Sequence, residues 1–473
     1  MLLSVLLAAA PLLAAAAKPP AKPAAKPAAK TARPAAAAKA KPGAAPAERS
    51  KAFPFPTESH TLGNGLRVVL VPYDSPGLVA YYTLMRVGSR NEVEKGKSGF
   101  AHFFEHMMFR GTKAHPAEEY NGTVTRLGLN TNAFTSEDMT VYHLYGPAKA
   151  LPTIIEYEGD RFKNLEYDEP AFRTEAGAIM GEYQKSASNP EQKLYEKMLE
   201  TAYSTHTYKH TTIGYLADIK DMPNAFQYSR QFFQRWYTPD NAMLVIVGDF
   251  DKGQTLTNIE KAYGGWTGKV ADVQVPQEPK QAKARRAEVP WETPTLPRLW
   301  IAWHAPSSAD LKAAAVQNLL NAYLFGPTSP LYQGLVLGKA TVDSMEATYG
   351  DHRDPYLFGV LLRVKDGKDL KAVEQAVLKD VSALAAGKVD AKRMEAVRGN
   401  LKYSNIMSLD KADSLALTLA VNTAQDGDLE FFNKEYAAIE DLKPADLSSF
   451  ARKYLLDANR TTITLQTAKG GAK

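Results

Sequence analysis

Apolar and polar positions divide this chain of 473 residues into two halves of similar pattern. Each half alternates short apolar runs, typical of buried strands, with longer stretches at helical spacing. The strand-like runs lie at 68–71, 80–87, 141–144, 244–247 and 298–303, and a helix-like run lies at 310–324. Because the chain is too long for one core and the order of elements repeats, we expect two domains, the second a diverged copy of the first.

A polar, basic and Pro-rich segment separates the two halves. It places an N-terminal domain at 53–270, an interdomain linker at 271–294 and a C-terminal domain at 295–470.

The first residues of the chain have a different composition. Residues 1–17 are rich in Leu and Ala, carry no charged side chain and end in small residues. This composition predicts a secretory signal peptide, and therefore a periplasmic or secreted protein that is soluble after cleavage. No Lys or Arg precedes the apolar run, so an uncleaved anchor is the alternative, although the run is short for a membrane span.

Residues 18–52 consist almost wholly of Ala, Lys and Pro, which predicts a disordered tether. The tether contributes +8 to the net charge of +5, so the rest of the chain carries −3. The basic character thus belongs to the tail, which argues against nucleic-acid binding by the folded part. The tail is either a solvated spacer or a weak contact to anionic membrane or cell wall. The chain has no cysteine and therefore forms no disulfide.

One short segment carries most of the candidate chemistry. His102 and His106 are four residues apart, so on a helix both imidazoles leave the same face. Two imidazoles on adjacent turns suit Zn²⁺, and Glu105 beside them can act as general base for a metal-bound water. The order His-x-x-Glu-His is the inverted zinc-protease motif.

A third ligand is expected from a second helix-like stretch, 172–183. Glu175 and Glu182 are seven residues apart there, so both carboxylates share a helix face. One of these carboxylates would complete a three-ligand site and leave the fourth position open.

These segments resemble the M16 family of zinc peptidases, which includes pitrilysin, insulysin and the mitochondrial processing peptidase. The family has a glutamate ligand about 76 residues after the motif, and 75 residues separate His106 from Glu182 here. Further similar stretches are 62–70, 87–92, 132–138 and 237–250, and the resemblance spans roughly 55–465. It implies an α+β fold of two duplicated domains, each a mostly antiparallel sheet with helices on one face.

The resemblance also implies roles for single residues. His102, His106 and Glu182 would bind one Zn²⁺ per chain, Glu105 would be the general base, and Glu175 would support a ligand. Asn132, Ala133 and Phe134 would offer a strand edge to the substrate. The implied activity is zinc-dependent endopeptidase action on unfolded polypeptides or peptides. The alternative is a non-catalytic structural or peptide-binding subunit, whose hallmark would be a broken metal triad.

The second half departs from the family pattern. Many members carry an Arg and a Tyr seven residues apart that hold the substrate backbone and the developing oxyanion. Val336 and Asp343 stand at these places, and neither donates a hydrogen bond to an oxyanion at neutral pH. We therefore expect a second M16 chain to supply this clamp, in a heterodimer. The alternatives are a homodimer and a substitute clamp at Tyr349 or Arg353.

Overall fold

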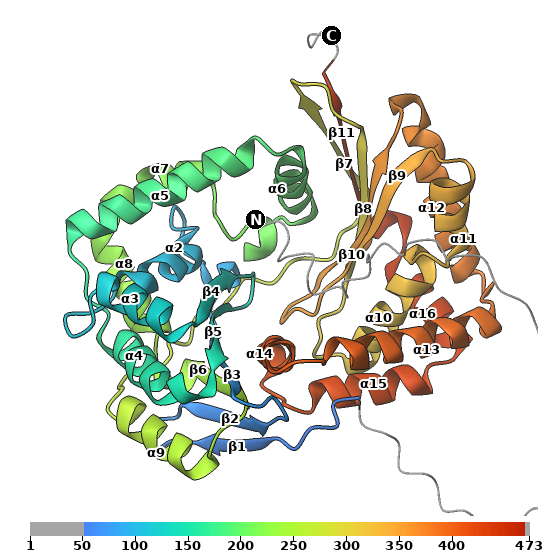
Figure 1. The fold of residues 1–473 in the computed structure, drawn as a ribbon. Helices are drawn as coiled ribbons and strands as arrows, with labels where there is room; N and C mark the ends of the chain where they lie inside the picture. Colours follow the sequence, from blue (N-terminus) through green and yellow to red (C-terminus); the bar gives the residue numbers. More distant parts are fainter. Residues whose placement is uncertain (1–51, 469–473) are drawn as a thin grey trace, which may run out of the picture.

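The computed structural model describes residues 52–468. The expected signal peptide 1–17 and the expected tether, apart from its last residue Ala52, lie outside the described residues. Two sheets with helices packed against them form two halves (Figure 1), which confirms the expected α+β class.

The first sheet has six strands in the order β1-β2-β6-β3-β5-β4, and only β2 and β6 are parallel neighbours. Its strands are β1 (Glu58–Thr61), β2 (Arg67–Pro72), β3 (Leu78–Met85), β4 (Asn130–Thr135), β5 (Thr140–Pro147) and β6 (Ala242–Gly248). The helices of this half are α2 (Phe100–Met107), α3 (Ala117–Leu127), α4 (Leu151–Asn164), α5 (Glu169–Ala187), α6 (Pro190–Ala202), α7 (Leu216–Asp221), α8 (Phe226–Trp236) and α9 (Lys252–Tyr263).

The second sheet has five strands in the order β7-β11-β8-β10-β9. Its strands are β7 (Arg285–Trp291), β8 (Arg298–Ala305), β9 (Val342–Thr348), β10 (Tyr356–Val364) and β11 (Arg460–Thr467). The helices are α10 (Leu311–Phe325), α11 (Pro330–Tyr332), α12 (Leu370–Ala385), α13 (Ala391–Ser408), α14 (Ala412–Asp426), α15 (Phe431–Asp441) and α16 (Pro444–Tyr454).

The two sheets share one topology, which supports a duplication. A parallel pair, β2 with β6 or β7 with β11, is followed by three antiparallel strands in the same spatial order. Five α-helices follow the fourth of these strands in each half: α4 to α8 after β5, and α12 to α16 after β10. The extra strand β1 is the main addition to the first sheet.

Both faces of the first sheet are buried, because successive apolar residues of its strands point to opposite faces. Val68 and Leu70 pack under the helices of their own half, including α2 and α5. Val69 and Val71 point to the opposite face. There they meet α14, which comes from the second half and also contacts β3 and β6.

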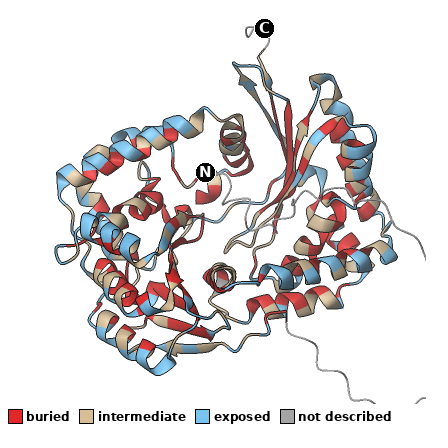
Figure 2. Cartoon of the chain, viewed as in Figure 1, coloured by how far each residue is buried: buried red, intermediate tan, exposed pale blue. Residues whose placement is uncertain are grey.

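The second sheet is covered in the reciprocal way. Helix α6 leaves the first half and packs on β7 and β11, with Leu194 and Met198 buried against Ile463 and Leu465. Figure 1 shows α6 and α14 between the two halves, and Figure 2 shows the buried strands that they cover. Each half therefore completes the core of the other, and the two form one packed unit.

The segment expected as a linker, 271–294, contains an element that the sequence analysis missed. No helix or strand lies at 264–284, but Arg285–Trp291 forms β7, which pairs with β11. As an edge strand, β7 alternates exposed and half-buried residues, so its composition resembles that of a loop. Its basic residues have partners, since Arg285 donates to the carbonyl oxygen of Thr201 and Arg286 pairs with Glu374. The outer domain boundaries stay predictions.

Within residues 52–468, no helix has both the length and the apolar composition needed to cross a bilayer.

Candidate metal centre

The helix that carries His102 and His106 starts at a buried carboxylate. Glu92 is 4% exposed, and its two oxygens accept hydrogen bonds from the backbone N–H groups of Gly99 and Ala101, both at 2.7 Å. These are amides of the first turn, which have no partner inside the helix. Gly99 has φ +92°, and a Cβ there would lie 2.6 Å from the carbonyl oxygen of Ile213. The start of α2 is thus fixed by a cap and by close backbone packing.

His102 and His106 project from adjacent turns of α2 toward one carboxylate on α5. The Nε2 atoms of His102 and His106 lie 3.5 Å and 3.4 Å from Oε2 of Glu182. Asp168 caps the start of helix α5, because its side chain accepts a hydrogen bond from the N–H of Ala171. The long, uninterrupted α5 carries Glu182 across the face of α2.

The three residues fit a zinc ion by chemistry and by spacing. One ligand atom from each lies within 4.8 Å of the others, and this is the one such group of His, Cys, Asp or Glu within 52–468. Tetrahedral zinc with nitrogen and oxygen ligands separates neighbouring ligand atoms by about 3.3 Å. Two imidazoles and one carboxylate are a donor set that zinc enzymes use, and it leaves one position open.

Glu175 orients one of the imidazoles. Its Oε1 lies 2.9 Å from Nδ1 of His106, which leaves Nε2 of that ring directed at Glu182. Arg110 donates through Nε to the other oxygen of Glu175 at 2.6 Å. Burial alone would raise the pKa of Glu175, but the bonds from His106 and Arg110 outweigh burial and hold it below its ordinary value. An ionised carboxylate against a ligating imidazole fixes the ring and raises its basicity.

The pKa values of the two imidazoles move in opposite directions. Burial lowers the pKa of His102, which favours the neutral, metal-binding form. Burial acts in the same direction on His106, but bonds to Glu175 and Glu182 overcome it and raise its pKa to about 9. In the metal-free protein, His106 is therefore the imidazole that holds a proton.

Glu105 lies beside the three candidate ligands without being one of them. It is 8% exposed, and its Oε2 accepts a hydrogen bond of 2.6 Å from the hydroxyl of Thr135. Thr135 is the last residue of β4, so the strand expected to bind substrate also holds Glu105.

Strand β4 is an edge of the first sheet, as the expectation for Asn132, Ala133 and Phe134 requires. Side chains alternate along it: Ala133 is buried toward α2, and Phe134 packs on the opposite face. The N–H of Ala133 donates to Oδ1 of Asn132 at 2.9 Å. The Asn132 side chain would have to turn away before that N–H pairs with an added strand.

Val336 and Asp343, the residues expected at the family's clamp positions, offer no side-chain donor. Val336 is half-buried in the second core, and Asp343 accepts a hydrogen bond of 2.6 Å from Nε of Arg363. Tyr349, one possible substitute, donates its hydroxyl to Asp351 at 3.0 Å. The N–H of Arg353, the other, donates to Asp138 of the first half.

His206 and His210, spaced like a second ligand pair, have separate partners. Nε2 of His206 donates to Asp354 at 2.9 Å, whereas Nδ1 of His210 lies 3.0 Å from the carbonyl oxygen of Thr211. They do not form a second metal group.

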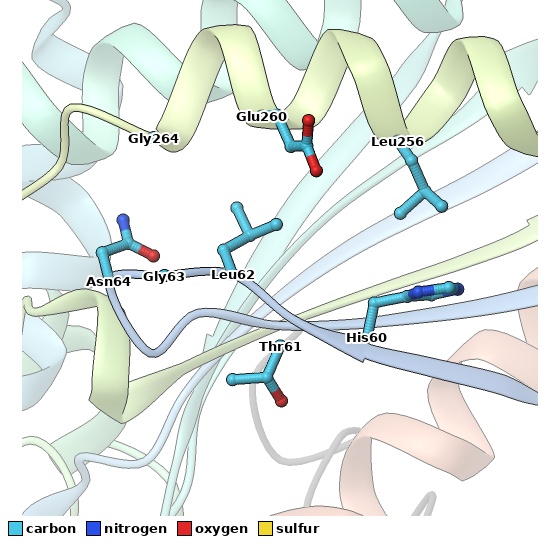
Figure 3. Close-up of a pocket in the computed structure, with 8 residues that line it drawn as sticks. All are labelled: His60, Thr61, Leu62, Gly63, Asn64, Leu256, Glu260 and Gly264. Atoms are coloured by element: carbon cyan, nitrogen blue, oxygen red, sulfur yellow. The ribbon is translucent and has the colours of Figure 1, made fainter.

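One surface hollow lies away from this cluster. It has a volume of about 380 Å³ and is lined by residues around β1 and by α9, among them His60, Asn64 and Glu260 (Figure 3). Strand β1 is at the opposite edge of the sheet from β4. This hollow is therefore not part of the candidate metal centre.

The structure brings together the five residues expected at the metal site, namely His102, Glu105, His106, Glu175 and Glu182. Three further residues at the site were missed by the sequence analysis: Arg110, Thr135 and Glu92. Arg110 is one turn beyond His106, a spacing that could have suggested a role. The contacts of Thr135 and Glu92 depend on how β4 and the preceding loop pack, which no local spacing reveals.

Comparisons with known proteins identify the family of the chain. Residues 68–215 match the family model described as Insulinase (Peptidase family M16), and residues 226–401 match the one described as Peptidase M16 inactive domain. The zinc protease PqqE of Helicobacter pylori is 28% identical over 415 residues, which are 86% of this chain and 92% of that protein. The beta subunit of the mitochondrial-processing peptidase of Lentinula edodes is 23% identical, over 85% of this chain and 88% of that one.

Solved structures show the same fold. A protease from Helicobacter pylori has a TM-score of 0.81 at 28% identity, covering 87% of this chain and 100% of that chain. The periplasmic protease PqqL from Escherichia coli has a TM-score of 0.71 at 19% identity, and the match covers 89% of this chain but 48% of that one. Since the two family matches together cover more than half of the chain, the chain belongs to the M16 (insulinase) family of peptidases.

Proposed function

We propose that this chain is a zinc-dependent endopeptidase in which His102, His106 and Glu182 hold one Zn²⁺ per chain. The observation that carries the proposal is the convergence of these three side chains, with the Glu105 carboxylate alongside. The names of the relatives as zinc proteases support the choice of metal.

Each residue has a distinct part in the proposed reaction. A zinc ion in this site supplies Lewis acidity, which polarises the scissile carbonyl and activates water. Glu105 takes the proton of the attacking water and later passes it to the leaving amine. Thr135 holds one oxygen of Glu105 and leaves the other free for that proton. Glu175, bonded to His106 and Arg110, keeps the ligating ring in place.

The proposed substrate is an unfolded polypeptide or peptide that adds as a strand to β4. Asn132, Ala133 and Phe134 lie on this edge, which ends at Thr135 and thus at Glu105. Strand addition pairs main chain with main chain, so it selects extended segments more than particular side chains. A folded protein would not present such a segment.

We place the enzyme outside the cytoplasm, in the periplasm or secreted, on the basis of residues 1–17. We also propose that it works with a second M16 chain that supplies the Arg/Tyr clamp. The lack of a donor at Val336 and Asp343 supports this partner, and one relative is named as a subunit of a larger enzyme. The basic tail would contact anionic membrane or cell wall only weakly.

The experiment that tests the function compares three proteins in zinc analysis and in hydrolysis of a quenched unfolded peptide. Glu105→Gln should keep about one zinc per chain and lose hydrolysis, because only the proton acceptor changes. His106→Ala should lose the zinc itself. Hydrolysis by Glu105→Gln at the wild-type rate would refute the assignment of the base. Zinc-loaded wild type that binds unfolded peptides but never cleaves them, with or without a second M16 chain, would favour a non-catalytic subunit.

A further inference from the structure

The turn that joins β4 to β5, residues 136–139, holds two buried carboxylates. Glu137 and Asp138 are each 1% exposed. Burying an ionised carboxylate is costly unless other groups hydrogen-bond to it, so their partners determine where the turn lies. Thr135, which donates to Glu105, directly precedes this turn.

Several of these partners come from the second half. Oδ2 of Asp138 accepts from Nδ1 of His352 at 3.1 Å and from the backbone N–H of Arg353 at 3.2 Å. Oε1 of Glu137 accepts from the hydroxyl of Tyr356 at 3.4 Å. His352 and Arg353 lie in the connection between β9 and β10, and Tyr356 is the first residue of β10. The β9–β10 hairpin of the second half therefore hydrogen-bonds to the β4–β5 turn of the first half.

A second ion pair joins the two halves, and here the second half supplies the carboxylate. Asp354 of the second half accepts from Nε of Arg90 at 2.5 Å and from Nε2 of His206 at 2.9 Å. The backbone N–H of Arg90 donates to the carbonyl oxygen of Glu137 at 2.8 Å. A displacement of Asp354 would therefore reach the turn through Arg90.

The turn has little freedom to move on its other side. A Cβ at Gly88 would lie 2.4 Å from the carbonyl oxygens of Ser136 and Glu137, so the two backbones are in direct contact. Within the first half, the hydroxyl of Tyr208 donates to Asp138 at 2.6 Å.

The two halves do not need this hydrogen-bond network to stay packed together. The exchanged helices α6 and α14 already bury apolar side chains on both sheets. Buried ion pairs add little stability compared with apolar packing, but they fix geometry where they occur. Here the fixed geometry is the end of β4.

We propose that His352, Asp354 and Tyr356 of the second half are positioning residues: they hold turn 136–139, and through it Thr135 against Glu105 and the substrate edge of β4. This inference rests on the proposed function for its catalytic consequence only. The ordering of β4 can be measured whether or not the chain cleaves peptides.

The test is hydrogen–deuterium exchange of the full chain, read at residues 130–140 and, for reference, at β2. Asp354→Asn removes the nearer of the two carboxylates that pair with Arg90, the other being Asp138 of the turn at 3.9 Å. Its matched control, Glu374→Gln, removes a buried carboxylate paired with Arg286 inside the second half. Asp354→Asn should speed exchange at 130–140 by about tenfold and leave β2 unchanged, whereas the control should leave both unchanged. Bound zinc should stay at the wild-type level.

A milder variant keeps the test decisive if Asp354→Asn does not fold. Tyr356→Phe removes a hydroxyl that donates to Glu137 at 3.4 Å and lies 3.1 Å from the hydroxyl of Tyr195. Glu137 keeps its bond from Tyr195, so we expect only about threefold faster exchange at the same amides. In an active enzyme, either variant should lower kcat with little change in zinc affinity. Unchanged exchange at 130–140, or an equal rise at β2, would overturn the proposal.

Discussion

At the scale of single residues, the contact between Glu175 and His106 makes a measurable prediction. Glu175→Gln replaces a carboxylate that accepts from both His106 and Arg110, so the ring loses its charged orienting partner. We expect zinc affinity to fall by about 10–100-fold, measured by chelator competition. Glu169→Gln, at the exposed start of the same helix, is the control and should bind zinc like wild type. Equal affinity of both variants would contradict the role of Glu175.

Thr135 provides a second test at this scale. Thr135→Val keeps the shape of the side chain but removes the donor to Glu105, leaving a buried carboxylate oxygen without that hydrogen bond. Such a loss costs about 1–3 kcal/mol, so we expect kcat to fall by about tenfold or more at unchanged zinc content. Thr131→Val changes the same residue type four positions earlier on β4 and should have little effect. An unchanged kcat in Thr135→Val would show that Glu105 needs no such anchor.

The proton on His106 predicts how zinc binding depends on pH. Hydrogen bonds to Glu175 and Glu182 overcome burial and raise its pKa to about 9 in the metal-free protein. Below that pH, zinc must displace a proton, so its apparent affinity should weaken by about tenfold for each unit of pH. Chelator competition between about pH 6 and about pH 8 measures this slope. Glu175→Gln should flatten it, and a wild-type affinity independent of pH would contradict the pKa.

The sequence predicted the residues whose roles follow from spacing along a helix. His102, His106 and the pair Glu175 and Glu182 are separated by whole turns, and helix geometry alone places each set on one face. Thr135, at the end of β4, contacts Glu105 30 residues before it, and Glu92, in a loop, contacts Gly99 7 residues after it. No periodicity in the sequence predicts either contact. Tertiary contacts of this kind set the fine positions of the site.

At the scale of elements, the start of α2 predicts a contrast between two glycines. Gly96 and Gly99 both have positive φ, but only at Gly99 would an added Cβ lie within 3 Å of the backbone of another segment. Gly96→Ala should cost about 1 kcal/mol from its backbone angle alone. Gly99→Ala should cost about 3 kcal/mol or more, because Ile213 must also move.

Denaturant unfolding with parallel zinc titration measures this contrast. Gly99→Ala should also weaken zinc binding, since the start of the helix that carries both histidines shifts. Similar unfolding free energies for the two variants would show that the loop at Ile213 adapts.

Three elements have positions that the sequence pattern does not predict. The edge strand β7 has the alternation of a half-exposed strand, but its polar and Pro-containing composition resembles that of a linker. Helices α6 and α14 have apolar faces in the sequence, yet nothing local states which sheet those faces cover. Exchange of helices between halves is a property of the folded chain and was not predicted.

At the scale of the whole molecule, the two halves contribute different parts of the candidate site. The first half carries the candidate metal centre on α2 and α5, and the second half, whose sheet has the same topology, has no corresponding group of ligands within the described residues. The second half contributes α14 to the core of the first and a hairpin tip to the turn after β4. A duplicated domain that has no metal can thus still shape the site of its neighbour.

The last prediction concerns a second chain. Peptide hydrolysis develops an oxyanion, and loss of one preorganised donor typically lowers the rate by about 10²–10³. At the two clamp positions, Val336 is apolar and Asp343 can only accept, so the donors must come from elsewhere. We expect the zinc-loaded chain alone to cleave unfolded peptides slowly, and an M16 chain that keeps the Arg and Tyr to raise kcat by about 10² or more on mixing.

The matched control is the same second chain with its Arg and Tyr replaced by Ala. It should still associate, as judged by sedimentation, but should not stimulate cleavage, because it would enclose the peptide without donating to the oxyanion. Full activity of this chain alone, with no gain on mixing, would refute the heterodimer. That result would direct attention to a homodimer or to the hydroxyl and guanidinium of Tyr349 and Arg353 as a substitute clamp.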